Sequence, residues 1–169
     1  MPRIALTPCA ATHYAALAYR LLPPQDNYTR APQAWFDSGF RPGQYPVSIL
    51  ADAAPVGFFI LDSGANRADY SDDAHALLLR SMSIHPAWQG RGIAALALAP
   101  PVLWAYIDRH IPAIRCLVLG VHHANAAARR LYLRCGFRDS GRTYPGLKGR
   151  QYIFEQTLGV LSKTNIFFN

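Results

Sequence analysis

The sequence predicts a mixed α/β fold, α+β in character, in which helices cover a central sheet. Seven short segments have strand patterns, and four others have apolar residues at helical spacing. The two kinds of segment alternate along the chain, as they do where helices pack on the faces of a sheet. With 169 residues, of which 51% are hydrophobic, the chain can bury one core, and we expect a single domain over residues 1–169.

The first part of the chain predicts one strand and two helices. Residues 3–7 form the strand, and the segment from about Ala10 to Leu21 has apolar residues at helical spacing until Pro23-Pro24 end the helix. Residues 31–38 predict a second, short helix, whose aromatic pair Trp35-Phe36 faces inward.

Three strands follow, over residues 45–51, 56–62 and 76–84. The connection between the first two is short, which favours a hairpin. Between the second and the third, residues 63–73 are polar and acidic and therefore predict a loop.

A third helix is predicted over residues 92–110, directly after the strand at 76–84. Two adjacent prolines interrupt it. Pro100 precedes a proline, which disfavours helical geometry, and Pro101 lacks the N–H of a helix donor. We therefore expect a kink or a break at this point.

The last part predicts a strand, a helix and two further strands. Residues 114–121 form a nearly continuous apolar run, as expected for a strand covered on both faces. Residues 125–135 predict a helix that ends at a glycine. The last two strands, 137–144 and 151–158, flank a turn at Pro145-Gly146, and the residues after 159 have no clear pattern.

The charge distribution favours an anionic partner. The net charge is +7, and residues 115–150 hold eight lysines and arginines against a single acid, Asp139. The partner is either a nucleic acid or a phosphorylated cofactor. No helix-turn-helix, zinc-finger or aromatic RNA-binding signature accompanies the basic half, so the sequence favours the cofactor over nucleic acid.

Other classes are disfavoured by what the sequence lacks. Its longest apolar run, residues 93–102, is too short and too broken by prolines for a membrane span, and no signal-peptide core follows Met1. We expect a cytoplasmic protein without membrane association. Cys9, Cys116 and Cys135 are widely spaced with no CxxC pair, which favours core residues over a disulfide framework or a zinc site.

The turn after the strand at 76–84 is the first motif with chemical meaning. It reads Gln89-Gly90-Arg91-Gly92-Ile93-Ala94 and opens the third helix. Backbone N–H groups at a helix start bind phosphate, and glycines let the backbone approach it without a Cβ in the way. The Arg91 side chain can add charge to a pyrophosphate. The turn is neither a P-loop nor a complete dinucleotide fingerprint, so by itself it is an anion site or an ordinary tight turn.

A second motif lies in the predicted helix at 125–135. Its elements are Asn125, Ala128, Leu131-Tyr132 and Gly136-Phe137. With this motif downstream of the glycine turn, the chain resembles the GCN5-related N-acetyltransferase (GNAT) superfamily, whose first motif, Gln/Arg-x-x-Gly-x-Gly/Ala, is matched by Gln89, Gly92 and Ala94. The resemblance covers roughly residues 56–158, whereas residues 1–50 agree in pattern only.

The resemblance implies a mixed, mostly antiparallel sheet with a splay between two parallel central strands. It implies that the pantetheine arm of acetyl-CoA lies in the gap and that no metal takes part. The backbone of Met82, Ser83 and Ile84 would pair with pantetheine like an extra strand. The amides of Gln89 to Ala94 would hold the pyrophosphate, and Asn125 would contact the cofactor arm.

The reaction that the resemblance implies is direct attack of a neutral amine on the thioester. A backbone N–H near Ile84 could donate to the oxyanion, and the Tyr132 hydroxyl is the candidate general acid for the sulfur. The alternative for Tyr132 is a core aromatic residue. The general base is undecided among His75, His85, a water chain and solvent. The pair His122-His123 favours a solvated or capping role, because other metal ligands are missing at ligand spacing.

The acceptor is the least determined part. In this family the first two helices and the late hairpin, here residues 14–40 and 144–152, usually shape the acceptor site. A small-molecule amine is expected, and weak similarity to bacterial polyamine acetyltransferases leaves peptides, antibiotics and amino acids open. The acids Asp62, Asp69, Asp72 and Asp73 either attract a cationic amine or form a solvated loop. A homodimer is left open, and the alternative function is an acyl-CoA-binding module without transferase activity.

Overall fold

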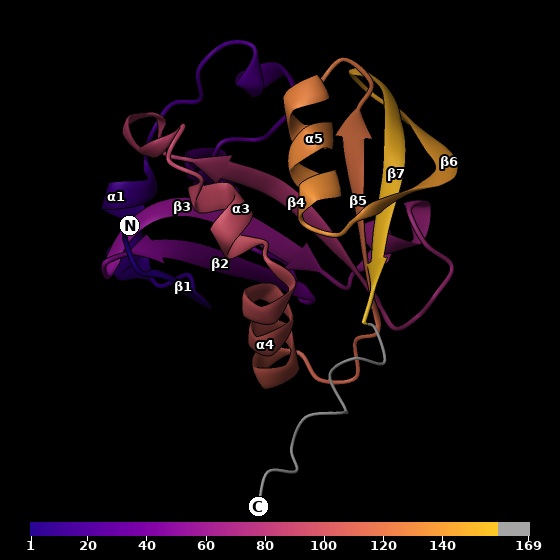
Figure 1. The fold of residues 1–169 in the computed structure, drawn as a ribbon, viewed down its shortest axis with the longest axis horizontal. Coiled ribbons are helices and arrows are strands. Elements are labelled where there is room, and N and C mark those ends of the chain that lie inside the picture. The colour runs from indigo at the N-terminus through magenta and orange to yellow at the C-terminus, as the bar shows by residue number, and fades with distance from the viewer. Residues whose placement is uncertain (159–169) are drawn as a thin grey trace, which may run out of the picture.

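A computed structural model of the chain describes residues 1–158, which form seven strands and five α-helices connected by loops and short 3₁₀ turns (Figure 1). The strands are β1 (Ile4–Pro8), β2 (Gln44–Ala51), β3 (Ala54–Asp62), β4 (Ala76–Ile84), β5 (Cys116–His122), β6 (Arg138–Gly146) and β7 (Gly149–Thr157). The helices are α1 (Tyr14–Leu17), α2 (Pro32–Ser38), α3 (Ile93–Ala97), α4 (Pro100–His110) and α5 (Ala126–Arg134).

All seven strands belong to one sheet in the order β1-β2-β3-β4-β5-β7-β6. Every neighbouring pair is antiparallel except β4 and β5, which are parallel. The prediction of a mixed, mostly antiparallel sheet flanked by helices is therefore confirmed.

The two parallel strands separate soon after they begin. Ala76 to Leu78 of β4 pair with Cys116 to Val118 of β5, and the pairing ends there. In Figure 1 the two strands start side by side and diverge toward their carboxyl ends, with α5 in front of the gap. The implied splay between the two central strands is therefore present.

A bulge in β4 accompanies the divergence. Phe58 of β3 pairs with Ser83 and Ile60 pairs with Arg80, so one residue of β3 faces two of β4. Ser81 lies in the bulge with φ 57°, a left-handed backbone conformation that is uncommon outside glycine. Because a bulge bends its strand and increases the local twist, it turns the end of β4 away from β5.

Both faces of the sheet are buried at β3. Alternate side chains of β3 point to opposite sides, so that Phe59 and Leu61 join the core under α3 and α4, whereas Phe58 and Ile60 pack with Trp35 of α2. The four side chains are fully buried, which explains the near-continuous apolar run of this strand.

The predicted third helix is broken into α3 and α4, as the prolines indicated. The break falls one residue earlier than the reasoning on Pro100 implied. Ala99 is extended (φ −56°, ψ 132°) because it precedes a proline, and Pro100 then opens α4. Pro100 and Pro101 lie in the first helical turn, where a missing N–H leaves no hydrogen bond unmade.

Two boundaries were predicted wrongly. The helix expected over Ala10 to Leu21 is reduced to α1 and a 3₁₀ turn, because Leu17, Tyr19 and Leu21 are all buried and this alternation requires extended backbone after Leu17. The last hairpin turns at Leu147-Lys148, and Pro145-Gly146 belong to β6. Residues 1–158 contain no helix long and apolar enough to cross a membrane.

Candidate active site

A cavity of about 650 Å³ occupies the gap between β4 and β5 and extends under α5. Its wall contains ten of the eleven residues that the sequence singled out for the site. These are Met82, Ser83, Ile84, Gln89, Gly90, Gly92, Ile93, Ala94, Asn125 and Tyr132. Two ends can be distinguished. The turn end is formed by the residues just named, and the loop end by Tyr28, Arg30, Tyr70, Arg80, Gly120, His122 and Gln151.

The edge of β4 that faces β5 is unpaired along the cavity. Beyond Leu78 no residue of β5 pairs with it, while Ser83 and Ile84 pair with β3 on the other side. Backbone groups of a strand point alternately to its two sides, so this edge presents N–H and C=O groups to the cavity. It can therefore accept an extended, amide-containing chain as an additional strand.

The glycine turn leaves space for a ligand against its backbone. Gly90 and Gly92 have φ of 74° and 73°, and a Cβ at either position would meet no atom within 4 Å. Gly92 is the N-cap of α3 without a side-chain cap, so the first N–H groups of the helix have no side-chain acceptor. Since α3 has only five residues, an anion at this turn would be held by direct hydrogen bonds rather than by a large helix dipole.

Gln89 and Arg91 brace the turn with their side chains. The Gln89 amide donates to the Ile84 carbonyl (2.9 Å) and forms a reciprocal pair with Gln25 (3.0 and 3.2 Å). The Arg91 guanidinium donates to the Ala87 carbonyl (3.1 Å) and lies over the Trp88 ring. Arg91 is the one predicted site residue outside the cavity wall.

Asn125 begins α5 on the opposite wall. Its Oδ1 accepts a hydrogen bond from the N–H of Ala128 (3.2 Å), which is the usual role of an asparagine N-cap. Because the cap uses the oxygen, the Nδ2 amide remains to donate into the cavity.

Tyr132 lies about two turns further along α5 and also lines the cavity. Its side chain is only 8% exposed, and its ring packs edge-on against Phe137. Burial, with a smaller contribution from Cys135, raises the pKa of its hydroxyl above the ordinary value. Within residues 1–158, every fully buried side-chain oxygen has a hydrogen-bond partner. The Tyr132 hydroxyl has no partner among these residues, so it is not fully buried. Because Tyr132 lines the cavity, its hydroxyl opens onto it.

The loop end is closed by residues far apart in the sequence. The loop after Pro24 reaches the end of β5, where Tyr28 packs on His122 (4.8 Å between ring centroids), and the β6–β7 hairpin, where Lys148 donates to the Asp26 carbonyl (3.4 Å). This loop and the hairpin belong to the two segments that the resemblance assigned to the acceptor site. The helices α1 and α2 themselves are absent from the described cavity wall.

The floor of the loop end is formed by Tyr70, Gln151 and Gly120. The Tyr70 hydroxyl donates to Gln151 Oε1 (2.9 Å), and both side chains press on Gly120, where a Cβ would collide with them. Burial, with Tyr144 adding to the effect, raises the pKa of Tyr70 to about 12.

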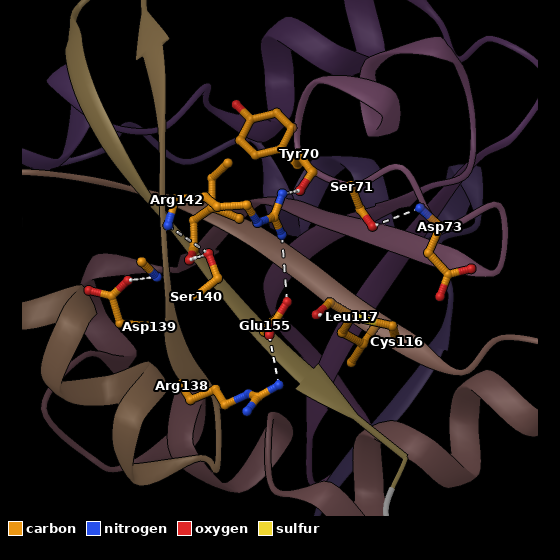
Figure 2. A network of polar contacts seen from close by, with 12 residues as sticks. Tyr70, Ser71, Asp73, Cys116, Leu117, Arg138, Asp139, Ser140, Arg142 and Glu155 are labelled. Atoms are coloured by element: carbon orange, nitrogen blue, oxygen red, sulfur yellow. Dashed lines mark hydrogen bonds and ion pairs between the residues drawn. The ribbon is translucent and has the colours of Figure 1, made fainter.

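A polar network on the outer side of the sheet fixes the position of Tyr70 (Figure 2). Arg142 of β6 donates to the Tyr70 carbonyl (2.7 Å) and reaches Glu155 of β7 (3.5 Å), which also binds Arg138 (2.8 Å). Glu155 thus holds two arginines at the same carboxylate, and one of them ties the loop before β4 to the hairpin. The sequence reasoning missed Tyr70, whose signal was a lone aromatic residue in a polar loop.

Three histidines that were considered for chemistry have other roles. His122 accepts from the Ala124 N–H (3.1 Å) and its Nε2 bonds the Lys148 carbonyl (2.8 Å), so both ring nitrogens have backbone partners and the residue has a capping role. His75 precedes β4, at the opposite end of the strand from Ile84, and binds the Ala113 carbonyl. His85 accepts from Ala87, and neither it nor His75 is part of the cavity wall, so the structure does not support them as bases.

Of the two alternatives for the acidic residues, the structure does not support a cation-attracting loop. Asp62 is 2% exposed and is paired with Arg80, and Asp69, Asp72 and Asp73 lie outside the cavity wall. Within residues 1–158, no group of three histidine, cysteine, aspartate or glutamate side chains could hold a metal ion.

Comparisons with known proteins agree with the motifs. Residues 14–137 match the acetyltransferase (GNAT) family. The chain is 40% identical over 116 residues to the uncharacterized N-acetyltransferase YbbJ of Bacillus subtilis (strain 168). The aligned region covers 68% of this chain and 71% of that relative. The chain therefore belongs to the GNAT acetyltransferase family, and the prediction of an N-acetyltransferase is confirmed.

Solved structures show the same fold at low identity. The structure of AAC(6')-Ib in complex with paromomycin and acetyl-CoA has a TM-score of 0.72 at 13% identity, covering 96% of this chain and 98% of that chain. The ribosomal-protein-S18-alanine N-acetyltransferase from Escherichia coli has a TM-score of 0.58 at 19% identity, covering 98% of this chain and 100% of that chain.

Proposed function

We propose that this chain, working as one acetyltransferase domain, transfers the acetyl group of acetyl-CoA to a small primary amine by direct attack in a ternary complex. The observation that carries this proposal is the cavity between β4 and β5. It joins an unpaired strand edge, an open glycine turn and the hydroxyl of Tyr132. These are the parts that an acyl-CoA substrate and its reacting thioester require.

The turn end fits acetyl-CoA by its chemistry. Gly90 and Gly92 leave room for phosphate oxygens against the backbone, and the amides of Gln89 to Ala94 donate to the pyrophosphate. The edge of Met82, Ser83 and Ile84 pairs with the two amides of pantetheine, as an edge strand pairs with an added strand. Asn125 donates its Nδ2 amide to the same arm.

The reaction needs a donor for the oxyanion and a proton for the leaving thiolate. A backbone N–H near Ile84 supplies the first, in a site from which the bound substrates exclude water. Tyr132 supplies the second, because its raised pKa keeps the hydroxyl protonated until the sulfur becomes negative.

The proton of the attacking amine leaves through solvent. No carboxylate of the described residues lines the cavity, both ring nitrogens of His122 are used in hydrogen bonds with the backbone, and burial raises the pKa of Tyr70 to about 12. We therefore assign the role of base to none of these groups. The amine that reacts is therefore the neutral fraction, so the rate rises with pH.

A polyamine acceptor has no support from the cavity, since a polycation is usually bound by carboxylates and none lines it in residues 1–158. The alternative of an acyl-CoA-binding module without activity makes a different prediction. It requires tight binding of acetyl-CoA with no transfer to any amine.

The experiment is to incubate the protein with acetyl-CoA and a panel of primary amines and to follow the release of free CoA thiol. We expect thiol release that depends on an amine and rises with pH between neutral and about pH 9, as the neutral fraction of the amine grows. Binding of acetyl-CoA without amine-dependent release over the whole panel would favour the binding module.

A further inference from the structure

The loop end of the cavity is basic. Arg30 and Arg80 line it, and no aspartate or glutamate of the described chain does. Asp62, which pairs with Arg80, is 2% exposed and uses both carboxylate oxygens inside the protein, on Gly64, Gln44 and Arg80. This end of the cavity therefore offers positive charge and hydrogen-bond donors rather than carboxylates.

Both arginines are held at one aromatic ring. The Cζ atom of Arg30 lies 4.1 Å from the centroid of the Trp35 ring, and that of Arg80 lies 5.3 Å from it. Trp35 is buried, and its Nε1 donates to Ser81 Oγ (3.0 Å), which fixes the ring against the bulge of β4. Stacking occupies the faces of the guanidinium groups and leaves their N–H edges free for a planar or tetrahedral anion.

Much of the donor capacity of these arginines is unused. Arg80 makes one hydrogen bond, from Nη1 to Asp62 (3.3 Å), and its Nε and Nη2 have no acceptor among residues 1–158. Arg30 donates from Nη2 to the Ala34 carbonyl (2.7 Å) and to Ser38 Oγ (2.9 Å) and has no ionic partner in this part of the chain. Because Asp62 offsets only one of the two charges, an excess positive charge faces the cavity.

The position of Arg80 relates this charge to the reaction. Arg80 precedes Met82 by two residues, and two residues of a strand span at most about 7 Å. A group bound at Arg80 is thus a few bonds away from an amine that attacks beside Met82 to Ile84. We propose that the acceptor is a small amine that also carries an anionic group, a carboxylate or a phosphate, and that Arg30 and Arg80 bind this group.

The same charges act on the attacking amine. A nearby positive charge disfavours the ammonium form, so a larger fraction of the bound amine is neutral and nucleophilic. This effect suits a site in which no described carboxylate serves as a base. The anionic group of the acceptor offsets the repulsion during binding, whereas a second ammonium group would add to it.

The inference rests on the proposed acetyl transfer, and it is tested with amines that differ only in their second group. The amines γ-aminobutyrate, butylamine and putrescine share one carbon chain and carry an anion, no charge or a cation at the far end. Phosphoethanolamine and ethanolamine form the corresponding pair for phosphate. The readout is kcat/KM from thiol release with acetyl-CoA in excess.

We expect kcat/KM for the better of the two anionic amines to exceed kcat/KM for putrescine by at least about tenfold, the effect of one charge-assisted hydrogen bond. This ratio should fall at high salt. Which anionic amine is better distinguishes carboxylate from phosphate. In Arg30→Gln this ratio of kcat/KM values should fall to about three or less, because one positive charge is removed without disturbing Asp62. The matched control is Arg109→Gln, an exposed arginine on α4 outside the cavity wall, which should keep the ratio.

Arg80→Gln alone would leave the buried Asp62 carboxylate without its ionic partner and could unfold the chain. The double variant Asp62→Asn with Arg80→Gln keeps a neutral hydrogen-bonding pair, and its folding is checked by thermal unfolding. A wild-type preference for putrescine, or an anionic preference that survives in both Arg30→Gln and the double variant, would overturn the inference but leave acetyl transfer standing. Absence of thiol release with every amine would instead remove the proposed function itself, and the inference with it.

Discussion

The turn end of the cavity is built mainly of backbone, to which α5 adds the side chains of Asn125 and Tyr132, whereas the loop end is built mainly of side chains. At the turn end, Gly90 and Gly92 expose amides within one continuous segment, and the adjacent edge of β4 presents further backbone groups. At the loop end, Tyr28, Tyr70 and Gln151 come from three segments and are held by contacts between those segments. Backbone recognition suits a substrate that never changes, whereas side chains can change without rebuilding the fold. We therefore expect variants at the two ends to affect different kinetic constants.

The largest effect is expected from Tyr132→Phe at the turn end. Loss of the hydroxyl should lower kcat by about 100-fold, the usual contribution of a general acid, while the Kd for CoA changes by less than about twofold. Stopped assays of thiol release and calorimetric titration with CoA measure the two quantities. The control is Tyr106→Phe, another buried tyrosine, on α4 and outside the cavity wall, and unchanged turnover in Tyr132→Phe would contradict the role.

The pH profile gives an independent readout of the same residue. Tyr132 must be protonated to act as an acid, and its pKa is raised above the ordinary tyrosine value. A raised pKa moves any loss of activity to higher pH, so kcat should show no alkaline fall below about pH 10. An alkaline fall well below that pH, absent from Tyr132→Phe, would mean that the hydroxyl ionises too easily for this role.

A smaller effect is expected from Gly92→Ala. Comparison with a second glycine of similar conformation distinguishes the loss of space for the ligand from the cost of backbone strain. Gly92 (φ 73°) and Gly141 of β6 (φ 77°) have nearly the same conformation, and a Cβ at either meets nothing within 4 Å. Alanine should destabilise the fold by about 1 to 2 kcal/mol at each position. Only Gly92→Ala should also weaken CoA binding, by about tenfold, because its methyl group fills space against the turn.

Equal CoA affinity in Gly92→Ala and Gly141→Ala, measured by calorimetric titration beside thermal unfolding, would show that the open space at the turn is not used by the ligand. In that case the turn end would bind through the β4 edge alone.

The smallest effect is expected from Gly120→Ala at the loop end. The added methyl group would meet the Tyr70 ring (2.7 Å from Cε1) and the Gln151 amide, so both must shift. The KM for the amine should rise by about threefold to tenfold, as for the loss of one hydrogen bond, with little change in the Kd for CoA. Steady-state kinetics with the best amine of the panel measure this, and a change in CoA affinity of the same size would mean that the two ends are not independent.

The strand β4 and the turn after it were predictable because their patterns are local. The predicted strand at 76–84 coincides with β4, and the break near Pro100 follows from the geometry of any residue before a proline. The helix from Ala10 to Leu21 failed for a non-local reason. Tyr19 is drawn into extended backbone, where it is buried and its hydroxyl bonds Ser83 of β4 (2.9 Å).

Tyr70 and Arg80 show the same limit at the site. Nothing beside Tyr70 in the sequence indicates that Gly120 and Arg142, about fifty and seventy residues away, place it on the cavity floor. No sequence pattern assigns a role to Arg80, because its pairing with Asp62 and its stacking on Trp35 depend on three separate elements.

The sequence by itself determined the family, the order of the elements and the glycine turn, because each depends on residues close together in the chain. The tertiary structure decided which side chains meet at the loop end and that their net charge is positive. It also placed the Arg91 guanidinium over the Trp88 ring, outside the cavity wall. The physical reason is that backbone geometry is set by neighbours along the chain, whereas charge and shape in a cavity are set by neighbours in space.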